Sequence, residues 1–311
     1  MYCIIKGAEG FGDRLQCLIY ALHYCYVSNR TLVVDWRDPH WSQVKYFPIN
    51  KFIKIKNIEV IDINDFLKER YNKELTVSNK KWYNLIDDDK FINYIYDTSF
   101  GLEDDNKIIK DIIDGNQKDF KENIVVYPGV GFRKYYKNYT QNIQFSDEVD
   151  SLVNEIYEKY NLIKNNYICI HIRAKSKNWK HKKNMNHKLS RRMDMLFPRE
   201  ERYFENLYKK LQRIEESIPV ILVSDCQSTA KRWIDKYKKG ILIENEKIQT
   251  KECSGIHLVN LENKDEKYKC KLNMLCLRDF CLMKNSKHLI SDQISLFSNM
   301  AKLFKNDKPQ I

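Results

Sequence analysis

The chain has 311 residues, a mass of 37.5 kDa, a formal net charge of +12, and 43% hydrophobic and 13% aromatic residues. This hydrophobic content excludes a wholly disordered protein, and no apolar run reaches the ~18 residues that a membrane-spanning helix needs. At ~100–200 residues per domain, the length predicts two domains. Because Glu9, Asp13 and Arg14 interrupt the apolar N-terminus, we expect no signal peptide and a soluble, cytoplasmic protein.

The cysteines and the charge narrow the function only slightly. The chain has nine cysteines, with no CxxC pair and no zinc-type Cys/His spacing, so we expect buried thiols and no metal site. Six of them lie in apolar segments: Cys3, Cys17, Cys25, Cys169, Cys276 and Cys281. The lysine excess suits phosphate-bearing substrates, nucleic acid or peripheral contact with an anionic membrane, and charge alone does not choose among them.

The first third of the chain predicts a βαβ unit. A strand at residues 2–6 is followed by a glycine loop, a helix from about Asp13 to Ser28, and a strand at 31–36. Such a unit requires a parallel sheet with helices on its faces. From Arg37 to about Asn142 the pattern is less regular, with expected strands "IEVIDI" and "NIVVY".

The second half predicts a regular alternation of strands and helices. A helix begins near Ser146, its expected N-cap, and the strand "YICIHIR" follows at 167–173. Further helices are expected near 198–216, 228–237, 271–285 and 295–304, with strands between them. We therefore predict an α/β protein with two Rossmann-like domains, at residues 1–150 and 151–311.

The glycine loop "GAEGFGDRL" lies between a strand and a helix, where backbone N–H groups can receive a ligand. A dinucleotide site would need GxGxxG and an acidic residue after the second strand, and Asp35 meets the second requirement. The spacing of Gly7, Gly10 and Gly12 is the reverse of that motif, and no Walker GK[ST] is present. The loop therefore argues against NAD or FAD.

The strand "ICIHIR" ends in two residues suited to a phosphorylated ligand. His171 and Arg173 lie on one face of the strand at its carboxyl end, the edge where open α/β sheets bind ligands. An arginine fork fits a diphosphate, and an imidazole can pack on a base or donate a hydrogen bond. The alternative is a salt-bridged arginine and a core histidine.

Four segments together resemble the NodZ-type fucosyltransferases and their α1,6-fucosyltransferase relatives. They are "GFGDRLQCLIYALHYCYVSNRTLVVDWRD", "HIR", "LVSDC" and "LRDFCLMKNSKHLISDQISLFSNMA", in the family's order and in both halves of the chain. The resemblance implies a GT-B fold with an interdomain cleft, a GDP-fucose donor, a glycan acceptor, inversion at the anomeric carbon and no obligatory metal.

The same resemblance assigns site residues. Arg173 would neutralise the β-phosphate as GDP leaves, and His171 would contact the nucleotide. The other donor-binding positions lie in the glycine loop, in "LVSDC" and in the late segment: Gly10, Gly12, Ser224, Asp225, Asp279, Ser295, Phe297 and Ser298. The chain departs from the family after the "HIR" strand, where "AKSKNWKHKK" is lysine-rich and has no carboxylate.

An inverting transferase also needs a group that accepts the proton of the acceptor hydroxyl. The candidates are Asp13, Glu9 and Asp35, and Asp13 is the one we assign; alternatively, Asp13 caps the helix and Asp35 holds Arg37 or a backbone amide. The aromatic segment 125–139 either lines an acceptor groove or packs between the domains. Arg191 or Arg192 either contacts a phosphate or lies in a loop that has no such role.

Two other functions remain open from the sequence. A basic α/β protein that binds nucleic acid would need a continuous basic stripe with exposed aromatics, whereas the lysines here are spread over most helices. An inactive carbohydrate- or nucleotide-binding relative would bind GDP without turnover.

Overall fold

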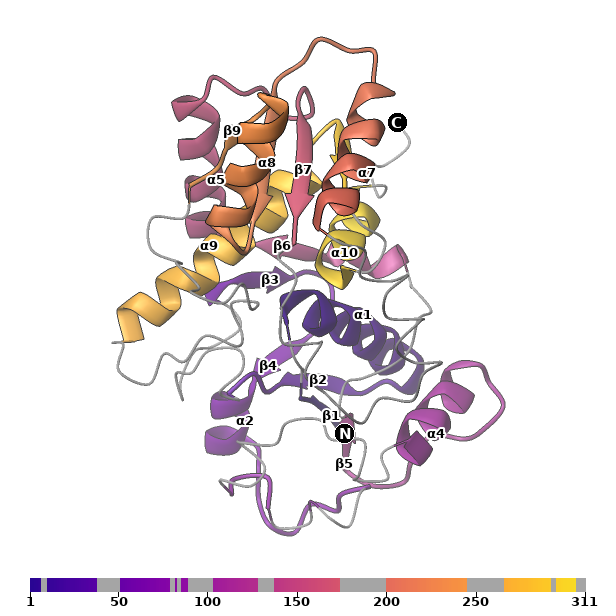
Figure 1. Ribbon diagram of the computed structural model, residues 1–311. Coiled ribbons are helices and arrows are strands. Elements are labelled where there is room, and N and C mark those ends of the chain that lie inside the picture. Colours follow the sequence, from indigo (N-terminus) through magenta and orange to yellow (C-terminus); the bar gives the residue numbers. More distant parts are fainter. Residues whose placement is uncertain are drawn as a thin grey trace, which may run out of the picture. The chain divides into compact units, whose positions relative to one another are not determined.

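The computed structural model describes residues 1–6, 10–37, 51–78, 82, 85–88, 103–127, 137–173, 200–244, 266–291 and 295–305 (Figure 1). These residues form two compact units. The first contains the described residues up to Val149 and the part of helix α9 (Glu266–Lys284) that ends at Leu277. The second contains those from Asp150 to Glu244 and from Arg278 to Lys305.

The first unit is built on a parallel sheet. Its described strands are β1 (Tyr2–Ile5), β2 (Thr31–Val34), β4 (Val60–Asp62) and β5 (Ile124–Tyr127), in the order β4-β2-β1-β5. Helix α1 (Phe11–Ser28) lies along one face, with α4 (Glu103–Ile113) in contact with it (Figure 1). On the other face, α2 (Ile63–Glu69) packs against the sheet. The βαβ unit predicted from the sequence is confirmed.

Helix α1 begins two residues before the predicted start. Gly10 is its N-cap, and the carbonyl of Gly10 accepts hydrogen bonds from the N–H groups of Asp13 and Arg14 at 3.0 and 3.1 Å. The backbone of Gly10 has φ −79°, so this position does not use the ability of glycine to adopt positive φ. The helix ends at Asn29 in the left-handed conformation, a common C-terminal cap.

The middle of the chain contains elements that the sequence pattern does not predict. Strands β3 (Ile53–Ile55) and β6 (Ile143–Phe145) pair antiparallel, and a short 3-10 helix, η4 (Lys137–Asn142), precedes β6. Ser146 then accepts a hydrogen bond from the N–H of Val149 at 3.4 Å, which confirms it as the N-cap of α5 (Asp147–Lys159).

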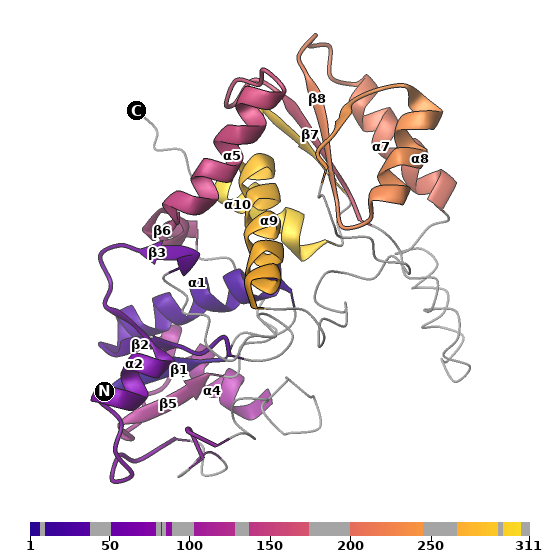
Figure 2. The same cartoon turned by 90° about the vertical axis from the view of Figure 1, so that its left-hand side faces the viewer.

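The second unit repeats the parallel architecture. Its described strands are β7 (Ile168–Ile172), β8 (Val220–Ser224), β9 (Ile241–Leu242) and β10 (His288–Ile290), in the order β10-β7-β8-β9. Helices α7 (Glu200–Gln212) and α8 (Gln227–Tyr237) cover one face (Figure 2). On the other side lie α10 (Leu296–Lys305), the part of α9 from Arg278 to Lys284, and α5.

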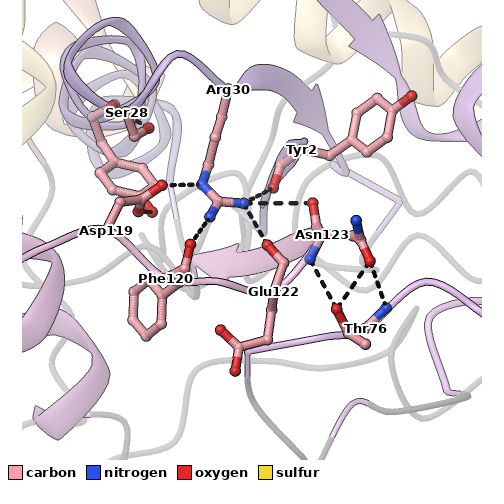
Figure 3. A network of polar contacts seen from close by, with 9 residues as sticks. Tyr2, Ser28, Arg30, Thr76, Asp119, Phe120, Glu122 and Asn123 are labelled. Atoms are coloured by element: carbon pink, nitrogen blue, oxygen red, sulfur yellow. Dashed lines mark hydrogen bonds and ion pairs between the residues drawn. The ribbon is translucent and has the colours of Figure 1, made fainter.

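A buried arginine connects distant segments of the first unit (Figure 3). The guanidinium of Arg30 donates to the carboxylate of Asp119 at 2.8 Å and to the carbonyls of Phe120 and Glu122 at 2.6 and 2.9 Å. The hydroxyl of Tyr24 donates to the same carboxylate at 2.6 Å. Arg30 therefore joins the turn between α1 and β2 to the segment that leads into β5.

Substitution of Arg30 by methionine should destabilise the first unit. It leaves the Asp119 carboxylate and several carbonyls without their donor, and loss of one partner of a buried ion pair costs about 3 kcal/mol. Urea unfolding followed by circular dichroism measures the change. Arg30→Lys, which keeps the charge but not the planar fork, should recover only part of the loss, and a methionine variant as stable as the wild type would contradict this role.

Candidate functional site

The strand order of the second unit locates a candidate site at the carboxyl ends of β7 and β10. Strands β7, β8 and β9 follow one another in one direction, and β10 returns to the opposite side of β7. Ligands in open α/β sheets bind where the strand order reverses in this way. The "HIR" segment at the end of β7 and the serines that follow β10 meet this requirement.

His171 and Arg173 have different surroundings at the end of β7. His171 is buried, with its ring centroid 5.7 Å from that of Phe297. Arg173 follows the last residue of the strand and is exposed, and no described residue forms an ion pair with it. Within the described part of the chain, the salt-bridged alternative for this arginine therefore has no partner to support it, whereas the histidine does pack in the core.

Side chains from neighbouring elements bind the backbone of the "HIR" segment. The hydroxyl of Tyr203, on α7, accepts from the N–H of Arg173 at 3.1 Å and donates to the carbonyl of His171 at 3.3 Å. The hydroxyl of Ser224 donates to the carbonyl of Ile172 at 2.6 Å. Sequence reasoning missed Tyr203, because a tyrosine in an amphipathic helix gives no sign of a contact with a strand 30 residues earlier.

The predicted pair Ser224 and Asp225 lies at the same edge of the sheet, where β8 ends. Ser224 is buried, and its oxygen also accepts from the N–H of Cys226 at 3.0 Å. Its hydroxyl thus connects the ends of β7 and β8 to the start of α8. Asp225 is half-buried. Contact of either residue with a donor stays a prediction.

The late segment adds an aromatic and polar group beside His171. Phe297, in α10, lies 5.5 Å from Phe280 of α9 between ring centroids, and Phe280 directly follows Asp279. The buried Ser298 donates to the carbonyl of Ser295, which is also buried, at 3.2 Å. The structure therefore places residues of the late segment on the same face of β7 as His171.

Asp279 has a close partner that sequence reasoning missed. The buried guanidinium of Arg278 donates from Nε at 3.0 Å and from Nη2 at 2.8 Å, both to Oδ1 of Asp279. A signal for this pair was present, because adjacent opposite charges inside the apolar run "LRDFCLM" must be paired if the helix is buried.

The first unit presents the other predicted residues at the carboxyl end of β1. Gly10 and Gly12 lie at the start of α1, and Gly12 is buried. Asp13 is half-buried in the first turn of α1. The N-cap is Gly10, so the alternative in which Asp13 caps the helix is wrong. Burial raises the pKa of the Cys17 thiol, and the negative charge of Asp13 raises it further.

Asp35 lies in a buried ion-pair cluster. Its carboxylate accepts from Lys6 at 3.0 Å and from the Arg37 guanidinium at 2.8 and 3.0 Å. It also accepts from the backbone N–H of Arg37 at 3.2 Å, which confirms the structural alternative for this residue. Burial alone would raise the pKa of Asp35, but the charge of Lys6 and the hydrogen bonds of Arg37 lower it below its usual value. A buried carboxylate of low pKa is poorly suited to act as a base.

Several predicted features lie outside the described residues: Glu9, the lysine-rich segment 174–183, Arg191, Arg192 and most of the aromatic segment 125–139. None of the described helices combines the length and the hydropathy that a membrane span requires. The described residues contain no cluster of His, Cys, Asp and Glu that could hold a metal ion. The eight cysteines among them carry free thiols, six of them buried.

Comparison with known proteins gives a clear result for the fold. No protein-family model and no curated protein sequence matches the chain. Over 97% of its length the chain is similar in structure to a NodZ alpha-1,6-fucosyltransferase soaked with GDP-fucose, with a TM-score of 0.67, 16% identity and 92% of that chain covered. For fucosyltransferase NodZ from Bradyrhizobium the TM-score is 0.66, at 18% identity with 97% and 92% of the two chains covered.

A second type of fucosyltransferase shows the same fold at lower similarity. POFUT1 in complex with GDP-fucose matches with a TM-score of 0.58 and 12% identity, over 99% of this chain and 95% of that chain. The similarity includes both units, and these neighbours are GT-B fucosyltransferases. The protein therefore has the fold of the GT-B fucosyltransferases, and the fold class predicted from the sequence is confirmed.

The buried Asp35 cluster predicts a pH-dependent stability. Because the folded pKa of Asp35 lies below the unfolded value of about 3.9, its stabilisation is complete above that value and is lost as the pH falls through the folded pKa. Asp35→Asn should therefore lower the free energy of unfolding by about 3 kcal/mol at pH 7 and by less near pH 3.

Urea unfolding at pH 7, 5 and 3 tests this prediction. Asp147→Asn is the matched control, since the Lys54–Asp147 pair has side chains 52% and 88% exposed and should contribute little. A difference between the wild type and Asp35→Asn that does not change with pH would contradict the assignment.

Proposed function

We propose that this protein is an inverting glycosyltransferase that transfers fucose from GDP-fucose to a hydroxyl group of a glycan acceptor. The observation that carries the proposal is the exposed Arg173 at the end of β7, beside the strand-order reversal of the second unit. Further support comes from the neighbours in fold, whose structures contain GDP-fucose or GDP. We place the reaction in the cytoplasm because the chain keeps many buried thiols.

Breaking the bond between fucose and the diphosphate builds negative charge on the leaving GDP. A guanidinium at the β-phosphate stabilises that charge more in the transition state than in the ground state, and so lowers the barrier. Arg173 supplies this charge in our proposal, without an obligatory metal ion. His171 and Phe297 offer rings for the nucleotide. The Asp279 carboxylate, which Arg278 binds at Oδ1, accepts hydrogen bonds from the nucleobase in this proposal.

The N-terminal half serves the acceptor in this proposal. Gly10 and Gly12 keep their predicted role in donor binding, since they have no side chains at the start of α1. Asp13, half-buried in the first turn, accepts the proton of the attacking hydroxyl. Asp35 is less suitable, because Lys6 and Arg37 already occupy its carboxylate.

Calorimetric titration without added metal tests the donor site. We expect the wild type to bind GDP and GDP-fucose saturably and not to bind NAD. Comparing the affinities for GDP-mannose and GDP-fucose shows whether the site distinguishes the two sugars. Arg173→Ala should weaken GDP binding about 100-fold, since it removes a charge-assisted pair worth about 3 kcal/mol. If the folded wild type binds none of the guanine nucleotides, the proposal is overturned, and NAD or nucleic acid would then be the ligands to pursue.

The role of Asp13 has a separate test. Asp13→Asn should leave GDP affinity within twofold of the wild type and lower acceptor-dependent release of GDP from GDP-fucose by about 100-fold or more. Asp65→Asn, which changes the first-turn acid of α2, is the matched control and should leave both values unchanged. Equal turnover by the two variants would remove Asp13 as the base, and GDP binding by a wild type that shows no turnover would identify an inactive relative.

A further inference from the structure

We propose that Tyr203 and Ser224 are positioning residues that hold the end of β7 and thereby place the guanidinium of Arg173 against the β-phosphate of the donor. The inference rests on the proposed function and extends it. It assigns a role in phosphate recognition to two hydroxyl groups, one of which, on Tyr203, no sequence motif indicates.

The end of β7 is held by side chains at three consecutive residues. Ladder pairing with β8 reaches its last partners at Ile172 and Ser224. Just there, the hydroxyl of Tyr203 binds the carbonyl of His171 and the N–H of Arg173, at 3.3 and 3.1 Å. The hydroxyl of Ser224 binds the intervening carbonyl of Ile172 at 2.6 Å. The two side chains thus add hydrogen bonds to the backbone of β7 at the point where its pairing with β8 ends.

The two hydroxyl groups are well suited to this task. A phenol donates one hydrogen bond while its oxygen accepts another, and Tyr203 uses both capacities on the backbone of two alternate residues. Ser224 has a single hydroxyl hydrogen, and the Ile172 carbonyl, at 2.6 Å, lies nearer to the hydroxyl than the Cys226 carbonyl, at 3.0 Å. The serine oxygen also accepts a hydrogen bond from the N–H of Cys226. Both residues are buried, so water does not compete strongly for these hydrogen bonds.

Arg173 depends on this backbone for its position. It is exposed and forms no ion pair with any residue that the structure describes, so no side-chain partner there orients its guanidinium. The hydrogen bond of its own N–H fixes the position of its Cα–Cβ bond, the point from which the side chain extends toward a ligand. Small displacements matter, because charge stabilisation requires donors placed at the position of the developing charge.

A purely structural role for Tyr203 makes a different prediction. The Tyr203 ring belongs to the core between β7, α7 and α8, so its removal would destabilise the whole unit. Tyr203→Phe keeps the ring and deletes only the hydroxyl. If the hydroxyl acts through Arg173, the loss must fall on the β-phosphate and not on the rest of the nucleotide.

Calorimetric binding of GDP and GMP separates the two roles, since the two ligands differ by the β-phosphate. Tyr203→Phe should weaken GDP binding about five- to tenfold, the equivalent of one hydrogen bond, and leave GMP binding within twofold of the wild type. Ser224→Ala should act in the same direction, and serves as the second variant if Tyr203→Phe folds poorly.

Tyr167→Phe is the matched control. The hydroxyl of Tyr167 is buried in the same unit and donates to the carbonyl of Leu282 at 2.6 Å, away from Arg173. Its loss should lower the melting temperature without changing the ratio of GDP to GMP affinity. If the preference for GDP over GMP changes equally in Tyr167→Phe and Tyr203→Phe, the inference is overturned.

A double-mutant cycle completes the test. In an Arg173→Ala background, Tyr203→Phe should cause no further loss of GDP affinity, because the group through which it acts is gone. Additive losses, or an unchanged GDP-to-GMP ratio in Tyr203→Phe and Ser224→Ala, would overturn the inference and leave the proposed function intact. A wild type that binds neither GDP nor GMP would overturn both.

Discussion

Parallel pairing of β-strands is the constraint on which the rest of this structure depends. In each unit the described strands of the main sheet run in one direction, so each connection crosses over a face of the sheet and each carboxyl end reaches the same edge. Polar residues that follow the strands therefore gather at that edge even when they are far apart in sequence. Arg173, Ser224 and Ser295 are gathered in this way in the second unit.

The interior of each unit contains a carboxylate that is held in an ion pair, and the exposed Arg173 contrasts with both. At the carboxyl edge of the first sheet, Asp35 is held between Lys6 and Arg37; in the second unit, Arg278 holds Asp279. Each of these buried carboxylates has a partner, because an isolated ion would lose most of its hydration energy on burial. Arg173 differs, since it is exposed and no ion pair joins it to a described residue. In our proposal that contrast makes Arg173 available to a charged ligand, whereas Arg30 serves the fold.

Sequence patterns predicted the regular elements well and the irregular ones poorly. Apolar runs and helical spacing located the strands and helices of the second unit, because each element buries a face whose periodicity is written in the chain. Strands β3 and β6 escaped prediction, since three-residue strands carry too few side chains to show an alternation. The start of α1 was placed too late because its N-cap is a glycine and has no side chain to signal the cap.

The sequence by itself determined the α/β class, the two parallel sheets, and the candidates His171 and Arg173 at the end of one strand. These follow from local periodicity and from the rule that ligands bind at carboxyl ends of parallel strands. Only the tertiary structure decided which polar groups meet. Tyr203 binds the end of β7 and Arg278 pairs with Asp279 because helices packed on a sheet bring side chains to backbone groups that are distant in the chain or hidden by the local pattern.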